Sequence, residues 1–386
     1  RNRAHTSGVR ASISIANAAA QDAAGNDTMP NLNPDPTAAC STPGDQCTYY
    51  IDQGAFTCSI TRSGNTPTNA DTVGFYIDFN KQPGSFIQSD IVPTCGGGIS
   101  CGAGPEDAKL DNFVAVGWVD DMYRYTVDMT NIQGTGNVGI EIPAGAVSDI
   151  ADNPTAGCGP ITYDIDQGAI TGTITQTSDN PTNATTVGYE IALNKEPVDF
   201  DADDLQLGGT VGGTSLDNFT YVGEIEGEFV FTVDVVDILG SGTVTLALLA
   251  NKIQDEAGNF NNEIPAVSYV IDHTPPTVDK IERYDPNLET TNAAQVVWKI
   301  TFKESVASVD VDDFTLVDAN NSIVGEQISS VSSSSGKTIY VTASTGTSGN
   351  GHLRLEVIVP GATITDQVGN PMQVGFTAGE AYVIDR

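Results

Sequence analysis

The chain repeats itself about every 110 residues, and this period constrains its fold more than any single motif. A phrase that ends in Ile-Asp returns four times, with its aspartates at Asp52, Asp166, Asp272 and Asp385. A second phrase precedes each of these: it reads Asp-x-x-Gly-Asn at residues 22–26, 255–259 and 366–370, and Asp-x-x-Asp-Asn at residues 149–153. Such a period is typical of an array of similar small domains, which more often build length and surface than one active site.

Within each repeat, apolar and polar residues alternate with a period of two. The clearest runs are Val73–Phe79, Val187–Leu193 and Val296–Phe302, each preceded by a turn-rich phrase and followed by a polar corner. This alternation is typical of a strand with one face on a core. About seven such strands per repeat predict an all-β chain of tandem immunoglobulin-like β-sandwich domains in an elongated array.

The repeats place the domain boundaries at 50–163, 164–270 and 271–386, with residues 1–49 left over. Val9 to Ile15 match the last strand of a repeat, and Asp22 to Asn26 match its closing turn. A lone tail of this kind cannot bury its apolar face, and it exposes a strand edge. Either the missing part is encoded upstream, or another chain supplies it. If Arg1 is a true N-terminus, we expect the tail to complete a sheet on a neighbouring copy, giving head-to-tail assembly.

The formal net charge of −34 excludes two classes of partner. Nucleic acid and anionic lipid surfaces both require clustered Lys and Arg. The acidity is explained equally by solubility, by a supply of oxygen ligands for Ca²⁺, or by life in salty water. No run of 18 apolar residues occurs, so the sequence predicts no membrane span.

Six cysteines lie in the first half of the chain, without Cys-x-x-Cys spacing and without clustered histidines. A zinc site is therefore not indicated, and disulfides in an extracellular compartment are the better interpretation. Spacing predicts three pairs: Cys40–Cys47, Cys95–Cys101 and Cys58–Cys158.

The chain resembles the bacterial Ig-like repeats of large cell-surface adhesins. The matching pieces are the turn 180–184, the strand end Leu193 to Val198 with Asp204-Leu205, and the phrase 255–259. Their counterparts in the next repeat are Phe302 to Val306, Asp313-Phe314 and 366–370. The resemblance implies extracellular, tandem, rod-forming domains that are often stiffened by Ca²⁺ between neighbours. The first repeat departs from the pattern, because it has a Cys95–Cys101 insertion and carries Asp152 in place of glycine.

The recurring aspartates are candidate Ca²⁺ ligands. A turn alone explains Asp-x-x-Gly-Asn, because Asp bonds nearby amides and Gly takes positive φ. The alternative is that each phrase meets the next Ile-Asp at a domain boundary and binds an ion. The expected pairs are Asp22 with Asp52, Asp149 with Asp166, and Asp255 with Asp272; Asp366 is a further candidate.

The leading hypothesis for function is a self-associating structural segment of a secreted surface protein: an adhesin, a surface layer or an extracellular filament. The alternative is a carbohydrate- or protein-binding module that uses the insertion Pro93 to Pro105. Trp118 and Tyr123 are candidate aromatic contacts for it, although we expect both to pack in the core. A third is the non-catalytic part of a larger secreted hydrolase. The chain is not expected to be an enzyme, because His5, His273 and His352 are scattered. Sequons at Asn26, Asn183, Asn218 and Asn320 are candidate glycosylation sites.

Overall fold

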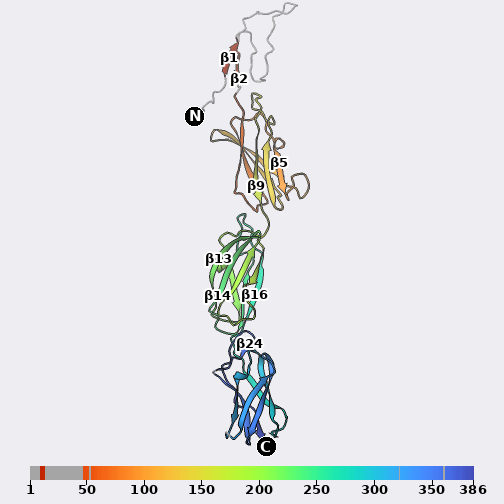
Figure 1. Ribbon diagram of the computed structural model, residues 1–386. Helices are drawn as coiled ribbons and strands as arrows, with labels where there is room; N and C mark the ends of the chain where they lie inside the picture. Colours follow the sequence, from red (N-terminus) through yellow and green to blue (C-terminus); the bar gives the residue numbers. More distant parts are fainter. Residues whose placement is uncertain (1–8, 14–46, 52–53, 321, 360) are drawn as a thin grey trace, which may run out of the picture. The chain divides into compact units, whose positions relative to one another are not determined.

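The computed structural model describes residues 9–13, 47–51, 54–320, 322–359 and 361–386, and it is all-β (Figure 1). The chain forms two compact units, 1–169 with 254–259, and 170–253 with 260–386. The helices in the described part are three short 3-10 turns, η1 (Gln88–Asp90), η2 (Ala202–Asp204) and η3 (Val311–Asp313). No helix of this part is long and apolar enough to cross a membrane.

The first unit contains a sandwich of two antiparallel sheets. One sheet has the order β3-β4-β7-β6: β3 (Cys58–Arg62), β4 (Val73–Phe79), β7 (Met122–Thr130) and β6 (Lys109–Val119). The other has the order β5-β8-β9: β5 (Val92–Gly97), β8 (Gly136–Ile142) and β9 (Cys158–Ile165). A β-bulge interrupts the register between β6 and β7 after Asp111, where Asn112 has a φ of 51°.

The same unit contains an antiparallel hairpin of β1 (Val9–Ile13) and β2 (Cys47–Ile51). Val9 pairs with Ile51, as Gly136 pairs with Ile165 in the hairpin of β8 and β9. The assignment of residues 1–49 to the end of an incomplete repeat stays a prediction. In the described residues this sheet has two strands, whereas the corresponding sheet of the first sandwich has three.

The second unit contains two sandwiches. The sheets of the first have the orders β10-β11-β14-β13 and β12-β15-β16. Their strands are β10 (Gly172–Gln176), β11 (Val187–Leu193), β14 (Glu228–Val236), β13 (Ser215–Ile225), β12 (Leu205–Gly209), β15 (Gly242–Leu248) and β16 (Ile264–Ile271). This order repeats that of the sandwich in the first unit strand for strand.

The last sandwich has the same frame with two short additions. Its sheets are β17-β19-β22-β21, with β24 beside β19, and β18-β25-β23-β20. The strands are β17 (Val278–Asp285), β19 (Gln295–Ala307), β22 (Gly336–Ser348), β21 (Val324–Val331), β24 (Thr365–Asp366), β18 (Thr290–Thr291), β25 (Ala381–Ile384), β23 (Gly351–Val357) and β20 (Phe314–Asp318). We call the three sandwiches first, second and third in chain order.

The period-two alternation predicted the core strands. In β4, β11 and β19 every second residue is buried, with exposures of 5% or less: Val73, Phe75, Ile77, Phe79, Val187, Tyr189, Ile191, Leu193, Val296, Trp298, Ile300 and Phe302. Each sandwich has its own hydrophobic core, closed by the last strand of its smaller sheet. Burial of these apolar side chains is the main term that stabilises each sandwich.

The Ile-Asp phrase ends a sandwich and does not open the next one. Ile165 and Ile271 belong to β9 and β16, and each is packed in the core of the sandwich that precedes it. The cores therefore divide the chain just after these residues, slightly later than the boundaries expected from the sequence. The preceding tyrosine explains the recurrence of the phrase, because its hydroxyl bonds to the facing sheet at Tyr163, Tyr269 and Tyr382.

Candidate metal site

Each Asp-x-x-Gly-Asn phrase in the described residues forms a closed turn, which we call a closing turn. In the third sandwich, Asp366 Oδ1 accepts hydrogen bonds from the backbone N–H groups of Val368 and Asn370, at 2.9 and 2.8 Å. Its Oδ2 accepts one from Asn370 Nδ2 at 2.7 Å. Gly369 has a φ of 93°, a conformation that favours glycine. The predicted turn is therefore present, with its aspartate buried to 3% exposure.

The closing turns of the second and third sandwiches each lie beside the Ile-Asp residues that end the preceding sandwich. Asn259 Nδ2 donates to the carbonyl oxygen of Asp166 at 2.8 Å, and Asn370 Nδ2 donates to that of Asp272 at 2.6 Å. The partners thus differ from the predicted pairs Asp149 with Asp166 and Asp255 with Asp272.

The antiparallel hairpin explains the difference. In the first sandwich, β9 runs for eight residues between the closing turn at Asp149 and the end at Asp166. At about 3.3 Å per residue, this strand holds the two aspartates roughly 25 Å apart, at opposite ends of the sandwich.

In the first sandwich, a lysine meets the aspartate of the closing turn. Lys81 Nζ lies 3.1 Å from Asp149 Oδ2 and donates to the carbonyl oxygen of Gly54 at 2.6 Å. Burial acts to raise the pKa of Asp149, but hydrogen bonds from Asn153, Lys81 and Ala151 outweigh it and hold the pKa below its ordinary value. A built-in cation therefore balances this buried carboxylate.

The third sandwich carries an acid at the position of that lysine. The backbone N–H groups of Asn80, Asn194 and Lys303 donate to Thr57, Thr171 and Thr277 at the same point of each sandwich. The next residue along the chain is therefore the same structural position, and it is Lys81, Lys195 and Glu304 in turn. The charge at this position is positive in the first two sandwiches and negative in the third.

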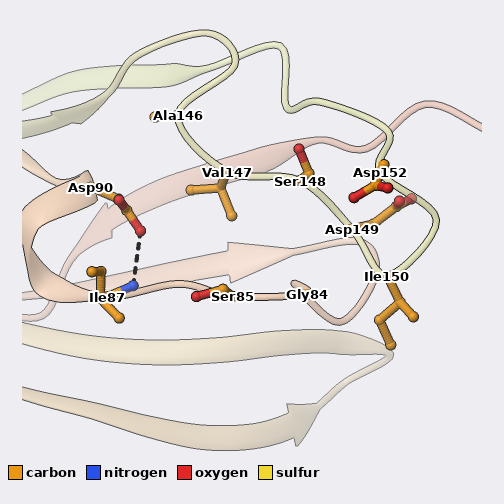
Figure 2. A pocket seen from close by; sticks show the side chains of 10 residues that line it. All are labelled: Gly84, Ser85, Ile87, Asp90, Ala146, Val147, Ser148, Asp149, Ile150 and Asp152. Carbon is orange, nitrogen blue, oxygen red and sulfur yellow. Dashed lines mark hydrogen bonds between the residues drawn. The ribbon is translucent and has the colours of Figure 1, made fainter. Parts of the chain in front are cut away.

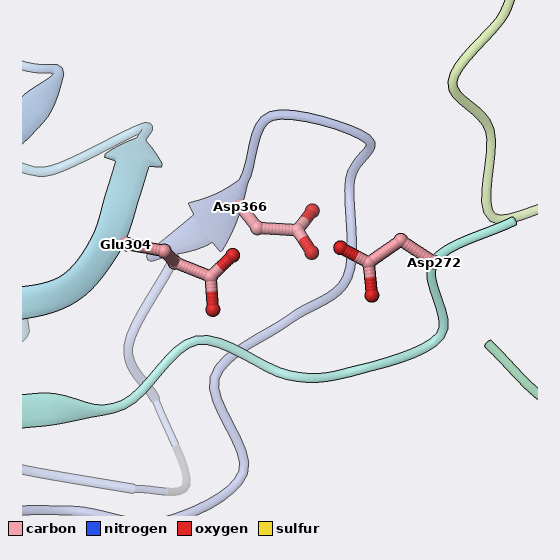
Figure 3. A group of neighbouring side chains, drawn as sticks. All are labelled: Asp272, Glu304 and Asp366. Carbon is pink, nitrogen blue, oxygen red and sulfur yellow. The ribbon is translucent and has the colours of Figure 1, made fainter. Parts of the chain in front are cut away.

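Three carboxylates consequently converge in the third sandwich (Figure 3). Glu304 comes from β19, Asp366 from β24, and Asp272 from the connection after β16. One oxygen of each lies within 4.8 Å of the others, and they form the one such group of metal-ligating side chains among the described residues. Asp366 is buried, and Asp272 and Glu304 are half-buried.

The charges in this group repel one another. Burial raises the pKa of Glu304, and the negative charges of Asp366 and Asp272 raise it further. Carboxylate and carbonyl oxygens are the ligands that Ca²⁺ prefers, in sets of six to eight. The three side chains fit part of such a set, with water and backbone carbonyls needed for the rest. Asp272 Oδ1 also accepts a hydrogen bond from the N–H of Thr274 at 2.9 Å, which fixes its orientation.

Of the other candidate ligands, Asp22 and Asp52 lie outside the described residues. Asp149 is paired with Lys81, and Asp255 is bonded within its own turn to Asn259. Glu304 was missed, although an acid in the polar corner after an alternating strand is visible in the sequence.

Two of the three predicted cysteine pairs are disulfides in the structure. Cys58 is joined to Cys158 with 5.8 Å between their Cα atoms, and Cys95 is joined to Cys101 with 5.6 Å. The pair Cys40–Cys47 cannot be described, because Cys40 lies outside the described residues.

The sequons fall in different environments. Asn183 is half-buried, and its amide donates to Asn370 Oδ1 at 3.3 Å. Asn218 and Asn320 are exposed, and Asn218 Nδ2 donates to Asp234 at 2.9 Å. Asn26 lies outside the described residues. Glycosylation stays a prediction. It is less favourable at Asn183 than at Asn320, because the side-chain amide of Asn183 is already hydrogen-bonded.

The cysteine-bounded insertion and the aromatic residues downstream do not form one site. The bridge between Cys101 and Ala108 closes the insertion immediately before β6, whereas Trp118 lies near the other end of that 11-residue strand. Trp118 is 55% exposed and packs edge-on against Tyr123, with ring centroids 5.5 Å apart. The expectation that Trp118 belongs to the core is wrong.

A surface hollow of about 580 Å³ lies beside the closing turn of the first sandwich (Figure 2). Three acidic residues line it: Asp90 accepts from the N–H of Ile87 at 2.9 Å, Asp149 is held by Lys81, and Asp152 is exposed. The aspartate of the closing turn is paired with a lysine here, whereas the third sandwich has Glu304 at that position.

No protein-family model and no curated protein matches the sequence. Among solved structures, the chain is similar to FdeC, an adhesin of Escherichia coli, at 13% identity and a TM-score of 0.35, over 86% of this chain and 97% of that one. The adhesin InvE of Yersinia pseudotuberculosis is 12% identical, with a TM-score of 0.22, over 63% of this chain and 66% of that one. Domains 1–6 of the surface layer protein SbsC are 10% identical, with a TM-score of 0.19, over 79% of this chain and about half, 53%, of that one.

Proposed function

We propose that this chain is a structural segment of a secreted cell-surface protein, built from immunoglobulin-like sandwiches joined in series. The observation that carries the proposal is the repeated joint, in which a closing turn bonds to the preceding Ile-Asp end. The joint recurs with the same donor and the same acceptor at two places in the chain. A contact that recurs at the same position of successive domains connects those domains and sets their spacing, as in a tandem array.

The disulfides support a secreted location. Bonds such as Cys58–Cys158 form and persist in oxidising compartments and are rare in the cytosol. The large negative charge keeps such a chain soluble and dispersed.

A calcium ion at Asp272, Glu304 and Asp366 is part of this proposal. The support is the comparison with the first sandwich, where an ammonium group occupies the corresponding position against Asp149. With glutamate in place of lysine, this position adds a third negative charge beside Asp366 and Asp272, and a divalent cation would offset most of that charge. Because Asp272 lies in the connection after β16, an ion there ties that connection to the closing turn of the third sandwich and restricts its movement.

Self-association through the N-terminal tail is the third part. The hairpin of β1 and β2 resembles the last two strands of a sandwich, and exposed strand edges recruit other strands. Head-to-tail contacts that do not close produce filaments. Removing residues 1–49 is expected to lower the assembly state measured by sedimentation. Unchanged assembly of the truncated protein would rule out strand donation by the tail.

The structural role is tested by small-angle scattering from the full chain. A serial array predicts a maximum dimension much larger than that of a compact particle of equal mass. A pair-distance distribution typical of a single globule would contradict the proposal.

A binding module is the second candidate function, and the exposed indole of Trp118 favours it. Exposed aromatic rings next to edge strands commonly contact ligands, and Val114 and Val116 extend the same exposed apolar surface of β6. A glycan array probed with the full chain and with Trp118→Ala tests this function. Binding that the substitution abolishes supports it, whereas an array without any signal removes it.

A further inference from the structure

The outer face of the larger sheet carries an internal ion pair in the first sandwich. Tyr76 and Asp78 alternate with the core residues of β4, so they lie on this face, and Arg124 of β7 is the sheet neighbour of Asp78. Arg124 Nε and Nη2 donate to the two oxygens of Asp78 at 2.7 and 2.8 Å, and its Cζ lies 4.9 Å from the ring centre of Tyr76. These hydrogen bonds raise the pKa of Arg124, and the charge of Asp120 in the adjoining turn adds to the rise. The face therefore holds its own cation.

The second sandwich has no such pair at the matching positions. Ala192 is the sheet neighbour of Val230, as Asp78 is of Arg124. Each pair lies one residue before the end of its strand, β11 or β4, so the two pairs occupy the same place in their sandwiches. Two short apolar side chains thus replace an aspartate and a long cation.

A hollow of about 500 Å³ lies at this place in the second sandwich, and we call it the acidic hollow. It is lined by Glu190, Ala192, Ile225, Glu226, Glu228 and Val230. Ala192 and Val230 are 9% and 5% exposed, so they form an apolar floor. The three glutamates are exposed and form the rim.

The negative charge of the rim is not balanced from within. None of the three glutamates forms a hydrogen bond or an ion pair with another residue in the described part of the chain. Between residues 170 and 271 the chain has two basic residues, Lys195 and Lys252, and neither lines the hollow. The acidic hollow therefore combines an apolar floor with uncompensated negative charge, the opposite of the face that holds Arg124.

The spacing of the rim carboxylates does not suit a single metal ion. In the described part of the chain, the one group of three acids whose ligand oxygens all lie within 4.8 Å of one another is Asp272, Glu304 and Asp366. The rim oxygens are more widely spaced, whereas Ca²⁺ needs its ligands at about 2.3–2.6 Å. A cation with an extended, partly apolar body suits the hollow better. Arginine has this form, because a planar guanidinium ends an apolar stem.

We propose that the acidic hollow binds an arginine side chain from a basic segment of a partner protein. The stem packs on Ala192 and Val230, and the guanidinium pairs with the rim carboxylates, as Arg124 pairs with Asp78 in the first sandwich. The net charge of −34 attracts a basic partner and disfavours a second copy of the chain. This binding function goes beyond the structural role proposed above and does not depend on it.

The test is saturation-transfer-difference NMR with the full chain and a capped pentapeptide, Gly-Ser-Arg-Ser-Gly. The matched probe carries citrulline in place of arginine, which keeps the length of the side chain and removes its charge. The side-chain CH₂ protons of arginine should receive saturation, because the stem contacts the floor. The citrulline peptide should bind at least about tenfold more weakly, because it lacks the charge that pairs with the rim.

Two double variants separate the rim from general charge attraction. Glu190→Gln with Glu228→Gln removes two rim charges and should weaken binding of the arginine peptide by about tenfold. Asp179→Asn with Glu263→Gln removes two charges at exposed positions of the same sandwich outside the hollow, and should match the parent protein. Thermal unfolding of each variant verifies that the sandwich remains folded.

A third double variant fills the hollow from within. Ala192→Asp with Val230→Arg reproduces the pair found in the first sandwich and should abolish binding of the arginine peptide. Three outcomes overturn the inference: no binding of the arginine peptide to the parent protein, equal binding of the citrulline peptide, or equal weakening by the rim variant and its control.

Discussion

The hydroxyl of Tyr269 links the two sheets of the second sandwich. It donates to the carbonyl of Gly188 at 2.9 Å and receives the N–H of Ser178 at 3.1 Å, while its ring packs edge-on against Tyr189. Tyr163 and Tyr382 make the corresponding bonds in the other sandwiches. A buried hydroxyl with two partners favours one arrangement of the sheets, because any slip would break both of its hydrogen bonds.

Tyr269→Phe is expected to destabilise the second sandwich by about 1–3 kcal/mol, because it removes the hydroxyl's hydrogen bonds to the carbonyl of Gly188 and from the N–H of Ser178. Calorimetric unfolding measures the loss. Tyr221→Phe is the matched control in the same sandwich, because Tyr221 is 48% exposed. Equal effects of the two substitutions would show that the buried hydroxyl contributes nothing.

Asp318 supplies the pH dependence of the turn that follows β20. Burial acts to raise its pKa, but hydrogen bonds from the N–H groups of Ile323, Asn320 and Ser322 outweigh it and lower the pKa. A folded-state pKa below the unfolded one stabilises the fold above the unfolded pKa of about 3.9. That stabilisation is lost as the pH falls through the folded-state pKa.

The melting temperature of Asp318→Asn is therefore expected to lie below that of the parent at pH 7. The gap should narrow as the pH falls below about 4, where the parent's carboxylate also becomes neutral. Thermal unfolding between pH 7 and pH 2 measures both curves. A gap of constant size across this range would show that the ionised carboxylate is not what stabilises the turn.

At the scale of single elements, the sequence predicted the strands well, but it predicted poorly which residues far apart in the chain come into contact. Alternation in β4, β11 and β19 follows from burial of one sheet face, so it is written locally in the chain. The partner of Asp272 is not local. It depends on which end of the sandwich the turn reaches, and the hairpin direction decides that.

Glu304 shows the same limit. Its acidic character and its place after an alternating strand are visible in the sequence, but its meeting with Asp366 and Asp272 requires three separate elements. The charge change from Lys81 to Glu304 becomes informative once the strand registers show that the two positions correspond.

The two disulfides are expected to contribute unequally. Cys58 and Cys158 are 100 residues apart, and Cys95 and Cys101 are 6 apart. If a disulfide acts by restricting the unfolded chain, the longer loop gives about 4.7 kcal/mol and the shorter about 2 kcal/mol.

Replacing Cys58 and Cys158 by alanine should therefore lower the stability of the first sandwich more than replacing Cys95 and Cys101. Denaturant unfolding of the two double variants gives the comparison. A larger loss from the Cys95–Cys101 variant would show that folded-state contacts of the insertion outweigh loop length.

At the scale of the whole molecule, the repeat period predicted an array of sandwiches, and the described residues form three separate hydrophobic cores. The repeats are similar in sequence, but they differ in charge at the position of Lys81 and Glu304. The first sandwich carries its own cation in Lys81, whereas the third has three acids at the same corner. We therefore expect the third sandwich, and not the first, to depend on an external ion for its full stability.

Calorimetric unfolding of the full chain with Ca²⁺ or with chelator, for the parent and for Glu304→Lys, tests this claim most directly. Ca²⁺ should raise the melting temperature of the third sandwich. At a Ca²⁺ concentration one hundred times the dissociation constant, its free energy of unfolding should increase by about 2.7 kcal/mol. Glu304→Lys should unfold at a higher temperature than the parent in chelator and show no shift with Ca²⁺, since its ammonium replaces the ion. Glu289→Lys, the same charge change at an exposed position of the same sandwich, should keep the shift. A transition that ignores Ca²⁺, or one that shifts equally in the parent and in Glu304→Lys, would contradict the account.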